Sequence, residues 1–319
     1  MPVQTLRARA AVLLTAPMLA VAAAASAQNY PEKPIRVYTT GVGGSSDLST
    51  RLIAQAMGGA FAQRMIVENR ALVSVETVAG AAPDGYSLLH YSNVLWLMPL
   101  LQANVPWDTF RDFAPIVLTV NTPNLLVVHP SLPVKSVKEL ITFAKARPGA
   151  LNYASTSLGA GNHVAAELFN SMAGVKIVRI NYKAMSAGFT DVVSGQVQVF
   201  FPSANSATQY VKSGRLRALA VTSAEPSSLV PDLPTVAAAG LPGYESVAMT
   251  AMFAPAKTPD AIVRRLNAEI NIALKKPETR ERFLTQGTEA MGGTPEQLTA
   301  VIKTEIARLS KIIKSNALQ

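Results

Sequence analysis

The chain of 319 residues contains no cysteine and only three histidines, His90, His129 and His163. The lack of cysteine excludes thiol catalysis, iron–sulfur clusters, cysteine-ligated zinc and a lipidated N-terminal cysteine. The histidines lie far apart, so they form no spaced metal-binding motif. Aromatic residues make up 6% and charged residues 15% of the chain, and like charges never cluster. Despite the net charge of +9, this pattern argues against nucleic-acid binding.

Common enzyme signatures are also missing. The sequence contains no G-x-S-x-G nucleophile motif, no phosphate-binding G-x-x-x-x-G-K-[ST] loop and no H-E-x-x-H zinc motif. We therefore expect no catalytic residues, no metal site and no cofactor.

The first 27 residues have the three parts of a cleavable export signal. Arg7 and Arg9 form a positive start, residues 10–24 are apolar, and Ala25-Ser-Ala27 is a small-residue cleavage site. The apolar run is short for a membrane span. We predict that residues 1–27 are removed on export and that a periplasmic protein of net charge +7 remains, because the segment carries two arginines and no acid.

Short apolar runs alternate with helical patterns along the rest of the chain. Strands are expected over 35–39, 65–67, 87–91, 125–128, 151–154, 176–180, 197–201, 217–221 and 247–253. Helices are expected over 46–60, 134–147, 162–173, 184–194 and 204–213. The alternation predicts an α/β fold with mostly parallel sheets. Two amphipathic helices starting at Thr258 and Thr294 have no strand of their own, so we expect them to pack on the first sheet or the domain junction.

Two loops rich in glycine and hydroxyl residues each follow a strand and open a helix. Glycines let a ligand approach the backbone, and a helix N-terminus adds unpaired N–H donors, so both loops predict an anion site. Strand ends of parallel sheets form ligand clefts, and we expect the two loops to face one cleft. A tight turn is the alternative for the first loop, and capping or packing for His163. The candidates are Thr40, Gly41, Gly43, Gly44, Ser45 and Asp47, then Ser155, Thr156, Ser157, Gly159, Asn162 and His163.

Four further candidates lie outside these loops: Ser74, Tyr182, Lys183 and Phe201. Lys183 would supply the only fixed positive charge near the cleft, with an exposed lysine as the equally open alternative. Arg70 is expected to pair with Glu68 or Asp84.

A series of short segments matches one known family in the family's own order. They include Tyr30-Pro-Glu-Lys-Pro-Ile-Arg36, Val67-Glu-Asn-Arg70, Ala82-Pro-Asp-Gly-Tyr86, Ile180-Asn-Tyr-Lys183 and Asp232-Leu-Pro-Thr235. In these segments the chain resembles the Bug family, the periplasmic substrate-binding proteins of tripartite tricarboxylate transport systems. The resemblance implies a two-lobed, type II-like α/β binding protein with two hinge crossings and no catalysis. It also implies a small carboxylate ligand and membrane permease subunits as partners.

We expect a monomer, with residues 28–124 plus 249–319 in lobe one and 125–248 in lobe two. The site departs from the family pattern where Ala71-Leu-Val-Ser-Val-Glu76 replaces a longer glycine-rich loop. We expect Leu72, Val73 or Val75 to point into the cleft. An apolar cleft would favour a monocarboxylate with an apolar body, in contact with Trp96, Met185 or Phe201.

Three alternatives remain open from the sequence alone. Instead of a transport receptor, the protein would then be a sensor that presents its ligand to a membrane kinase, a periplasmic hydrolase on the same fold, or a degenerate scaffold that binds nothing.

Overall fold

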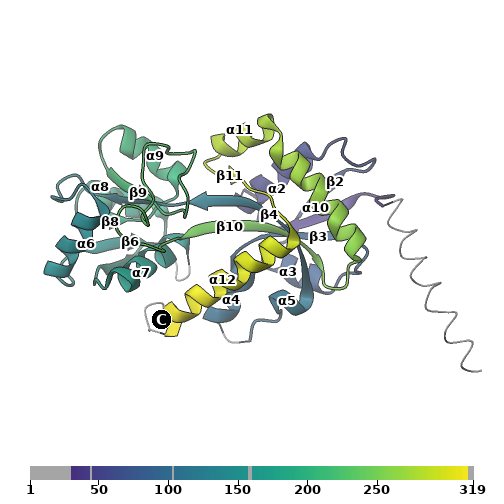
Figure 1. Cartoon of the computed structure of the whole chain (residues 1–319), viewed down its shortest axis with the longest axis horizontal. Helices are drawn as coiled ribbons and strands as arrows, with labels where there is room; N and C mark the ends of the chain where they lie inside the picture. Colours follow the sequence, from purple (N-terminus) through teal and green to yellow (C-terminus); the bar gives the residue numbers. More distant parts are fainter. Residues whose placement is uncertain (1–29, 44, 103, 157–159, 315–319) are drawn as a thin grey trace, which may run out of the picture.

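The computed structural model describes residues 30–43, 45–102, 104–156 and 160–314. The chain forms two lobes, each built on one sheet with helices on both sides (Figure 1). The two-lobed α/β fold is thus confirmed. The predicted export signal lies outside the described residues. Within them, no helix is both long enough and apolar enough to cross a bilayer.

The first lobe contains a six-stranded sheet in the order β11-β4-β10-β3-β1-β2. Its strands are β1 (Ile35–Thr39), β2 (Met65–Asn69), β3 (Ser87–Ser92), β4 (Phe113–Pro123), β10 (Val247–Pro255) and β11 (Glu289–Ala290). Its helices are α2 (Ser45–Ala56), α3 (Val73–Ala79), α4 (Val94–Leu101), α5 (Thr109–Asp112), α10 (Asp260–Lys275), α11 (Pro277–Thr285) and α12 (Pro295–Lys314).

The second lobe contains a five-stranded sheet in the order β7-β6-β8-β5-β9. Its strands are β5 (Leu125–Val128), β6 (Asn152–Ser155), β7 (Val178–Asn181), β8 (Val199–Phe200) and β9 (Arg217–Val221). Its helices are α6 (Val137–Ala146), α7 (Gly161–Ala173), α8 (Met185–Val193) and α9 (Ala204–Lys212).

Both sheets are mixed, which corrects the prediction of mostly parallel sheets. β1 runs parallel to β2 and β3, and β6 runs parallel to β7 and β8. By contrast, β10 is antiparallel to β3 and β4, and β5 is antiparallel to β8 and β9. The antiparallel pairs arise from the connection between the lobes. The chain leaves the first lobe along β4 and returns along β10, so these two neighbouring strands run in opposite directions.

The chain crosses between the lobes twice, and the crossings are tied together. Asn124 alone separates β4 from β5, whereas residues 222–246 separate β9 from β10. The Thr222 hydroxyl donates to the Ser246 carbonyl at 2.6 Å and accepts from the Asn124 backbone N–H at 2.8 Å. One side chain therefore joins both crossings. The lobe limits at 124/125 and 248/249 remain a prediction.

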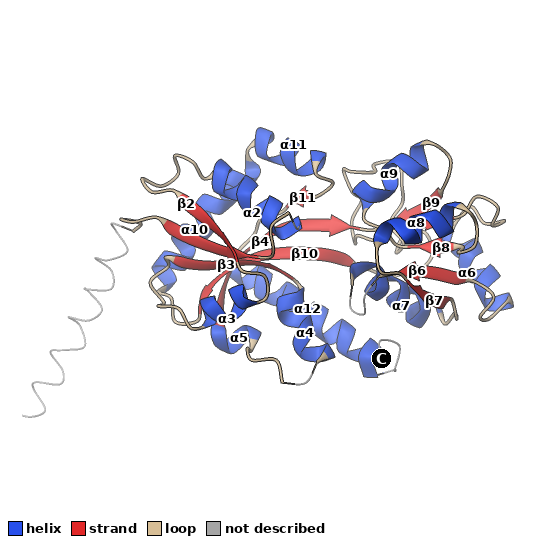
Figure 2. Cartoon of the chain, turned by 180° about the vertical axis from the view of Figure 1, so that it is seen from behind, coloured by secondary structure: helices blue, strands red, loops and turns tan. Residues whose placement is uncertain are grey.

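Alternation along β1 divides the first lobe into two core layers. Val37 packs with the α2 and α10 side of the sheet, while its neighbour Tyr38 packs with the α3, α4 and α12 side. The same division is visible in Figure 2, with α2, α10 and α11 on one side and α3, α4, α5 and α12 on the other. The C-terminal helices pack on the first sheet as predicted, and α12 also contacts α7 of the second lobe.

Candidate functional site

A cavity of about 410 Å³ lies between the two lobes, beside the first crossing. The first lobe contributes α2 and the turn after α11, and the second contributes the start of α7 and parts of α8 and α9. Its lining residues are Leu48, Thr122, Asn124, Thr156, Ala160, Gly161, Asn162, Met185, Phe201, Ser203, Asn205, Ala248, Gln286, Gly287 and Thr288.

Asn124 presents an unused hydrogen-bond donor at this cavity. The residue is 6% exposed, and its side-chain Nδ2 is buried with no hydrogen-bond partner among the described residues. The backbone of Asn124 is fixed by Thr222, so the side chain is held at the crossing. A buried donor without a partner is costly, and an acceptor oxygen from a ligand or water removes that cost.

The first predicted loop, after β1, is held by Asp47. The carboxylate accepts from the Gly43 backbone N–H at 2.8 Å and from Asn69 Nδ2 at 2.8 Å, and it pairs with Arg51 at 2.9 Å. Burial alone would raise the pKa of Asp47, but the bonds from Asn69, Gly43 and Arg51 outweigh it and lower the pKa. Asp47 is thus ionised at neutral pH, and its carboxylate holds the loop in shape through bonds to the protein.

Other residues of the first site prediction lie in or near this loop. Gly41 and Gly43 are exposed, and the buried Thr40 hydroxyl lacks a partner among the described residues. Ser74 is fully buried and donates to the Thr39 carbonyl at 2.6 Å, so in this structure it positions the end of β1 rather than facing the cavity. Ser45 begins α2, while Gly44 lies outside the described residues.

The second predicted loop, after β6, does reach the cavity. Thr156 and Asn162 line it and contact each other, with Thr156 Oγ1 3.3 Å from Asn162 Nδ2. Asn162 is only 4% exposed, so this contact fixes the entrance to α7. Ser157 and Gly159 lie outside the described residues.

Arg179, which the sequence analysis did not consider, supplies positive charge to this loop. Its guanidinium donates to Ser155 Oγ at 3.3 Å and to the Thr156 carbonyl at 3.0 Å. Burial, together with the charge of Arg179, lowers the pKa of His163 to about 4. His163 is 2% exposed and is therefore a neutral, packed side chain at neutral pH.

The remaining candidates divide between the cavity and the surface. Phe201 lines the cavity and packs against Phe169, with Met185 beside it on the wall. Tyr182 donates its hydroxyl to Asp191 at 2.7 Å, and Lys183 is exposed. Arg179, rather than the exposed Lys183, thus places a positive charge beside this loop, because its hydrogen bonds to Ser155 and Thr156 hold the guanidinium there.

Several expectations about the replaced loop are wrong. Val75 is fully buried in the core of the first lobe, whereas Leu72 and Val73 are exposed on α3 and its preceding turn, and none of the three lines the cavity. Trp96 is 1% exposed and does not line it either. The buried positions are explained by α3, a helix that the sequence analysis did not predict and that turns one apolar face to the sheet.

Arg70 also differs from its expected pairing. Its guanidinium lies over the Tyr38 ring at 5.3 Å, while Glu68 pairs with Arg36 and Asp84 pairs with Lys33. Glu68 on β2 instead meets Arg36 on the adjacent strand β1, and Asp84 meets Lys33 in the segment before β1.

The lobes touch on one side of the cavity through the turn after α11. Asn205 Nδ2 of α9 donates to the Gln286 carbonyl at 3.2 Å. A Cβ atom at Gly287 would lie 2.0 Å from Asn205 Cβ, and the φ angle of Gly287 is +71°, so glycine is required there. Sequence reasoning missed this turn, because Gln286 lies 81 positions from Asn205 and the turn carries no ligand motif.

Comparison with known proteins decides the family. The model of the tripartite tricarboxylate transporter family receptor matches residues 49–318. The chain belongs to this family. A protein from the tcbD-tcbE intergenic region of Pseudomonas sp. is 36% identical over 89% of this chain and 86% of its own length. BugT of Bordetella pertussis is 32% identical over 92% of both chains.

Solved structures agree with this receptor assignment. A protein of R. palustris, solved with adipate, is 31% identical with a TM-score of 0.71, over 89% of this chain and 97% of its own. The Bug resemblance found in the sequence is therefore confirmed, and the family is one of solute-binding receptors rather than enzymes.

Proposed function

We propose that this receptor captures a small organic carboxylate between its lobes in the periplasm and delivers it to the permease of a tripartite tricarboxylate-type transporter. Residues 1–27 are removed on export, and the receptor works as a monomer. The observation that carries the proposal is the Asn124 side chain, a buried donor without a partner at the interlobe cavity. The adipate in a relative's structure supports the carboxylate class.

The composition of the cavity supports one carboxylate with an apolar body. Its polar side holds the Asn124 and Asn162 amides, near the Arg179 charge that braces the Thr156 carbonyl. Leu48, Met185 and Phe201 form an apolar side. A second carboxylate against that side would lose its water without gaining partners, which is costly.

Asn124→Leu tests the capture mechanism, because it keeps the size of the side chain and removes its amide. A hydrogen bond to a charged group is worth about 1.5–3 kcal/mol, so the Kd of the bound carboxylate is expected to rise about 10- to 100-fold. Isothermal titration calorimetry measures this change. Asn170→Leu is the matched control for the same substitution in α7, where the amide bonds only within the second lobe.

A thermal-shift panel tests the ligand class. Isovalerate and phenylacetate represent apolar monocarboxylates, while adipate, malate and citrate represent acids with more charge. Ligand at 100 times its Kd adds about 2.7 kcal/mol, which moves the midpoint by several degrees. A shift with polycarboxylates alone contradicts the monocarboxylate preference but not carboxylate capture. No shift with any acid contradicts both and favours the scaffold that binds nothing.

A further inference from the structure

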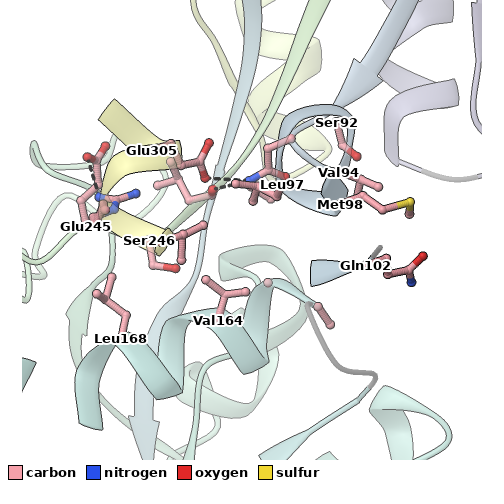
Figure 3. A pocket seen from close by; sticks show the side chains of 17 residues that line it. Ser92, Val94, Leu97, Met98, Gln102, Val164, Leu168, Glu245, Ser246 and Glu305 are labelled. Carbon is pink, nitrogen blue, oxygen red and sulfur yellow. Dashed lines mark hydrogen bonds and ion pairs between the residues drawn. The ribbon is translucent and has the colours of Figure 1, made fainter. Parts of the chain in front are cut away.

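A second cavity of about 430 Å³ lies between the lobes next to the first. Figure 3 shows it enclosed by α4 and α12 of the first lobe and by α7 of the second. The two cavities share Ala160, Gly161 and Ala248, but the first is bounded by α2 and the turn after α11 instead. The second cavity is thus a separate space on the α12 side of the crossing strands.

The wall of this second cavity is mainly apolar. α4 contributes Leu97 and Met98, α7 contributes Val164 and Leu168, and α12 contributes Leu309. Val164 and Leu168 face the other two helices across the space in Figure 3. Such a wall favours an apolar body, as in most small-molecule sites.

The charged side chains that line this cavity already have partners within the protein. Glu305, 4% exposed, accepts from Asn93 Nδ2 at 2.9 Å and from Trp96 Nε1 at 2.6 Å. Arg308 pairs with Glu245 at 3.1 Å. A ligand carboxylate would face two carboxylates, and a ligand ammonium would compete with the guanidinium. Both are costly in a buried space, so the arrangement favours an uncharged occupant.

One donor in the cavity remains unmet. Arg308 Nε is buried and has no hydrogen-bond partner among the described residues. Each oxygen of the Glu305 carboxylate accepts one bond and has a second lone pair to offer. A hydroxyl group both accepts and donates, so its chemistry matches both the Arg308 Nε donor and the spare acceptor capacity of Glu305.

We infer that the second cavity binds a small uncharged alcohol or phenol. The apolar body lies between α4 and α7, and the hydroxyl accepts from Arg308 Nε and donates to Glu305. This site is distinct from the carboxylate cavity and does not depend on the function proposed for that cavity.

Four probes with the same ring separate the chemical classes: benzyl alcohol, toluene, benzoate and benzylamine. Calorimetry and ligand-observed NMR on the mature chain are expected to show benzyl alcohol binding more tightly than toluene, by about three- to tenfold for one net hydrogen bond. Benzoate and benzylamine are not expected to displace it.

Three variants locate the binding. Val164→Trp fills the second cavity and is expected to raise the Kd of benzyl alcohol at least about tenfold. Leu48→Trp fills the first cavity and leaves that Kd unchanged, while blocking any benzoate bound there. Arg308→Lys keeps the charge beside Glu245 but removes the Nε donor, which is expected to raise the Kd about three- to tenfold. Val164→Phe replaces Val164→Trp if the larger residue prevents folding.

Each contrary result overturns the inference. Benzyl alcohol fails to bind, or Leu48→Trp weakens its binding as much as Val164→Trp does. Alternatively, benzoate displaces it in the Leu48→Trp variant, or Arg308→Lys leaves its affinity unchanged. None of these results bears on carboxylate capture, which the Asn124→Leu variant tests separately.

Discussion

Gly43 illustrates at the residue scale how one backbone angle sets the shape of the loop after β1. Its φ angle is +80°, a conformation that residues with a Cβ atom rarely adopt, and its N–H bonds the Asp47 carboxylate. Nearby Gly41 has no such angle, and a Cβ there would meet nothing within 4 Å. The same substitution at the two glycines therefore isolates the effect of the φ angle, with Gly41 as the control.

Gly43→Ala is expected to lower the free energy of unfolding by about 1–2 kcal/mol, the cost of the left-handed region for a non-glycine residue. Gly41→Ala is expected to change it by less than about 0.5 kcal/mol, the usual limit for a surface substitution. Urea unfolding of both variants measures the difference. Equal losses in the two variants would show that the loop angle does not matter.

Two buried histidines make the stability depend on pH. Burial lowers the pKa of His90 to about 3, and burial with the Arg179 charge lowers that of His163 to about 4, against an ordinary value of 6.5. Between about pH 6.5 and 4, the unfolded chain binds protons that the folded chain does not. This contribution to stability is therefore present above pH 6.5 and is lost as the pH falls toward 4.

His163→Gln removes one of the two histidines that bind a proton in the unfolded chain but not in the folded chain within this pH window. The slope of unfolding free energy against pH would decrease by up to about 1.4 kcal/mol per pH unit within that window. Urea titrations from neutral pH downward measure the slope. An unchanged slope would mean that His163 is protonated in the folded protein.

At the element scale, α4 and α12 are joined by a hydrogen bond to the carboxyl group of Glu305, whose pKa burial raises. Trp96 of α4 donates to the buried Glu305 of α12 at 2.6 Å, whereas Trp107 donates to the neutral Leu95 carbonyl at 2.8 Å. Both indoles are almost fully buried, so replacing either with phenylalanine removes a similar volume.

At a pH where Glu305 is ionised, Trp96→Phe is expected to destabilise the protein by about 1 kcal/mol more than Trp107→Phe, since bonds to charged groups are the stronger class. Neither variant is expected to change carboxylate affinity, because neither residue lines the first cavity. Urea unfolding and calorimetry test the two expectations. A large loss of affinity in Trp96→Phe alone would place α4 in the carboxylate site after all.

Elements with a continuous apolar signal were predictable from sequence. β1, β5 and β9 have the limits predicted, and all four residues of β5 are apolar and buried. The long crossing strand β4 was missed, because Pro115 and Pro123 interrupt its local pattern. In the folded sheet a register shift against β10 lies beside Pro115, and Pro123 is the last residue of the strand.

The site was predictable only where it followed a strand. Thr156, Asn162 and Phe201 line the cavity as expected of ligand-loop and strand-end residues. Asn124, Asn205 and Gly287 come from a crossing, a helix and a distant turn, so no local motif marks them. Their proximity results from packing between lobes, which sequence spacing does not encode.

At the scale of the whole molecule, the two crossings that Thr222 joins are expected to act as a hinge about which the lobes rotate toward each other around a ligand. Saturating carboxylate is therefore expected to reduce the radius of gyration measured by small-angle scattering. Asn124→Leu is the control and is expected to need a ligand concentration about 10- to 100-fold higher for the same reduction. An unchanged radius in the unmodified protein under saturation would contradict closure.

Under the proposed function, the position of Asn124 also predicts the order of events during capture. A residue in the crossing itself is expected to lie close to the axis about which the lobes rotate, and therefore to move little while they close. A carboxylate can thus bind to this stationary amide in the open protein, before Thr156 and Leu48 from opposite lobes approach it. Docking then precedes closing, and the encounter rate should be insensitive to substitutions that alter only the swing.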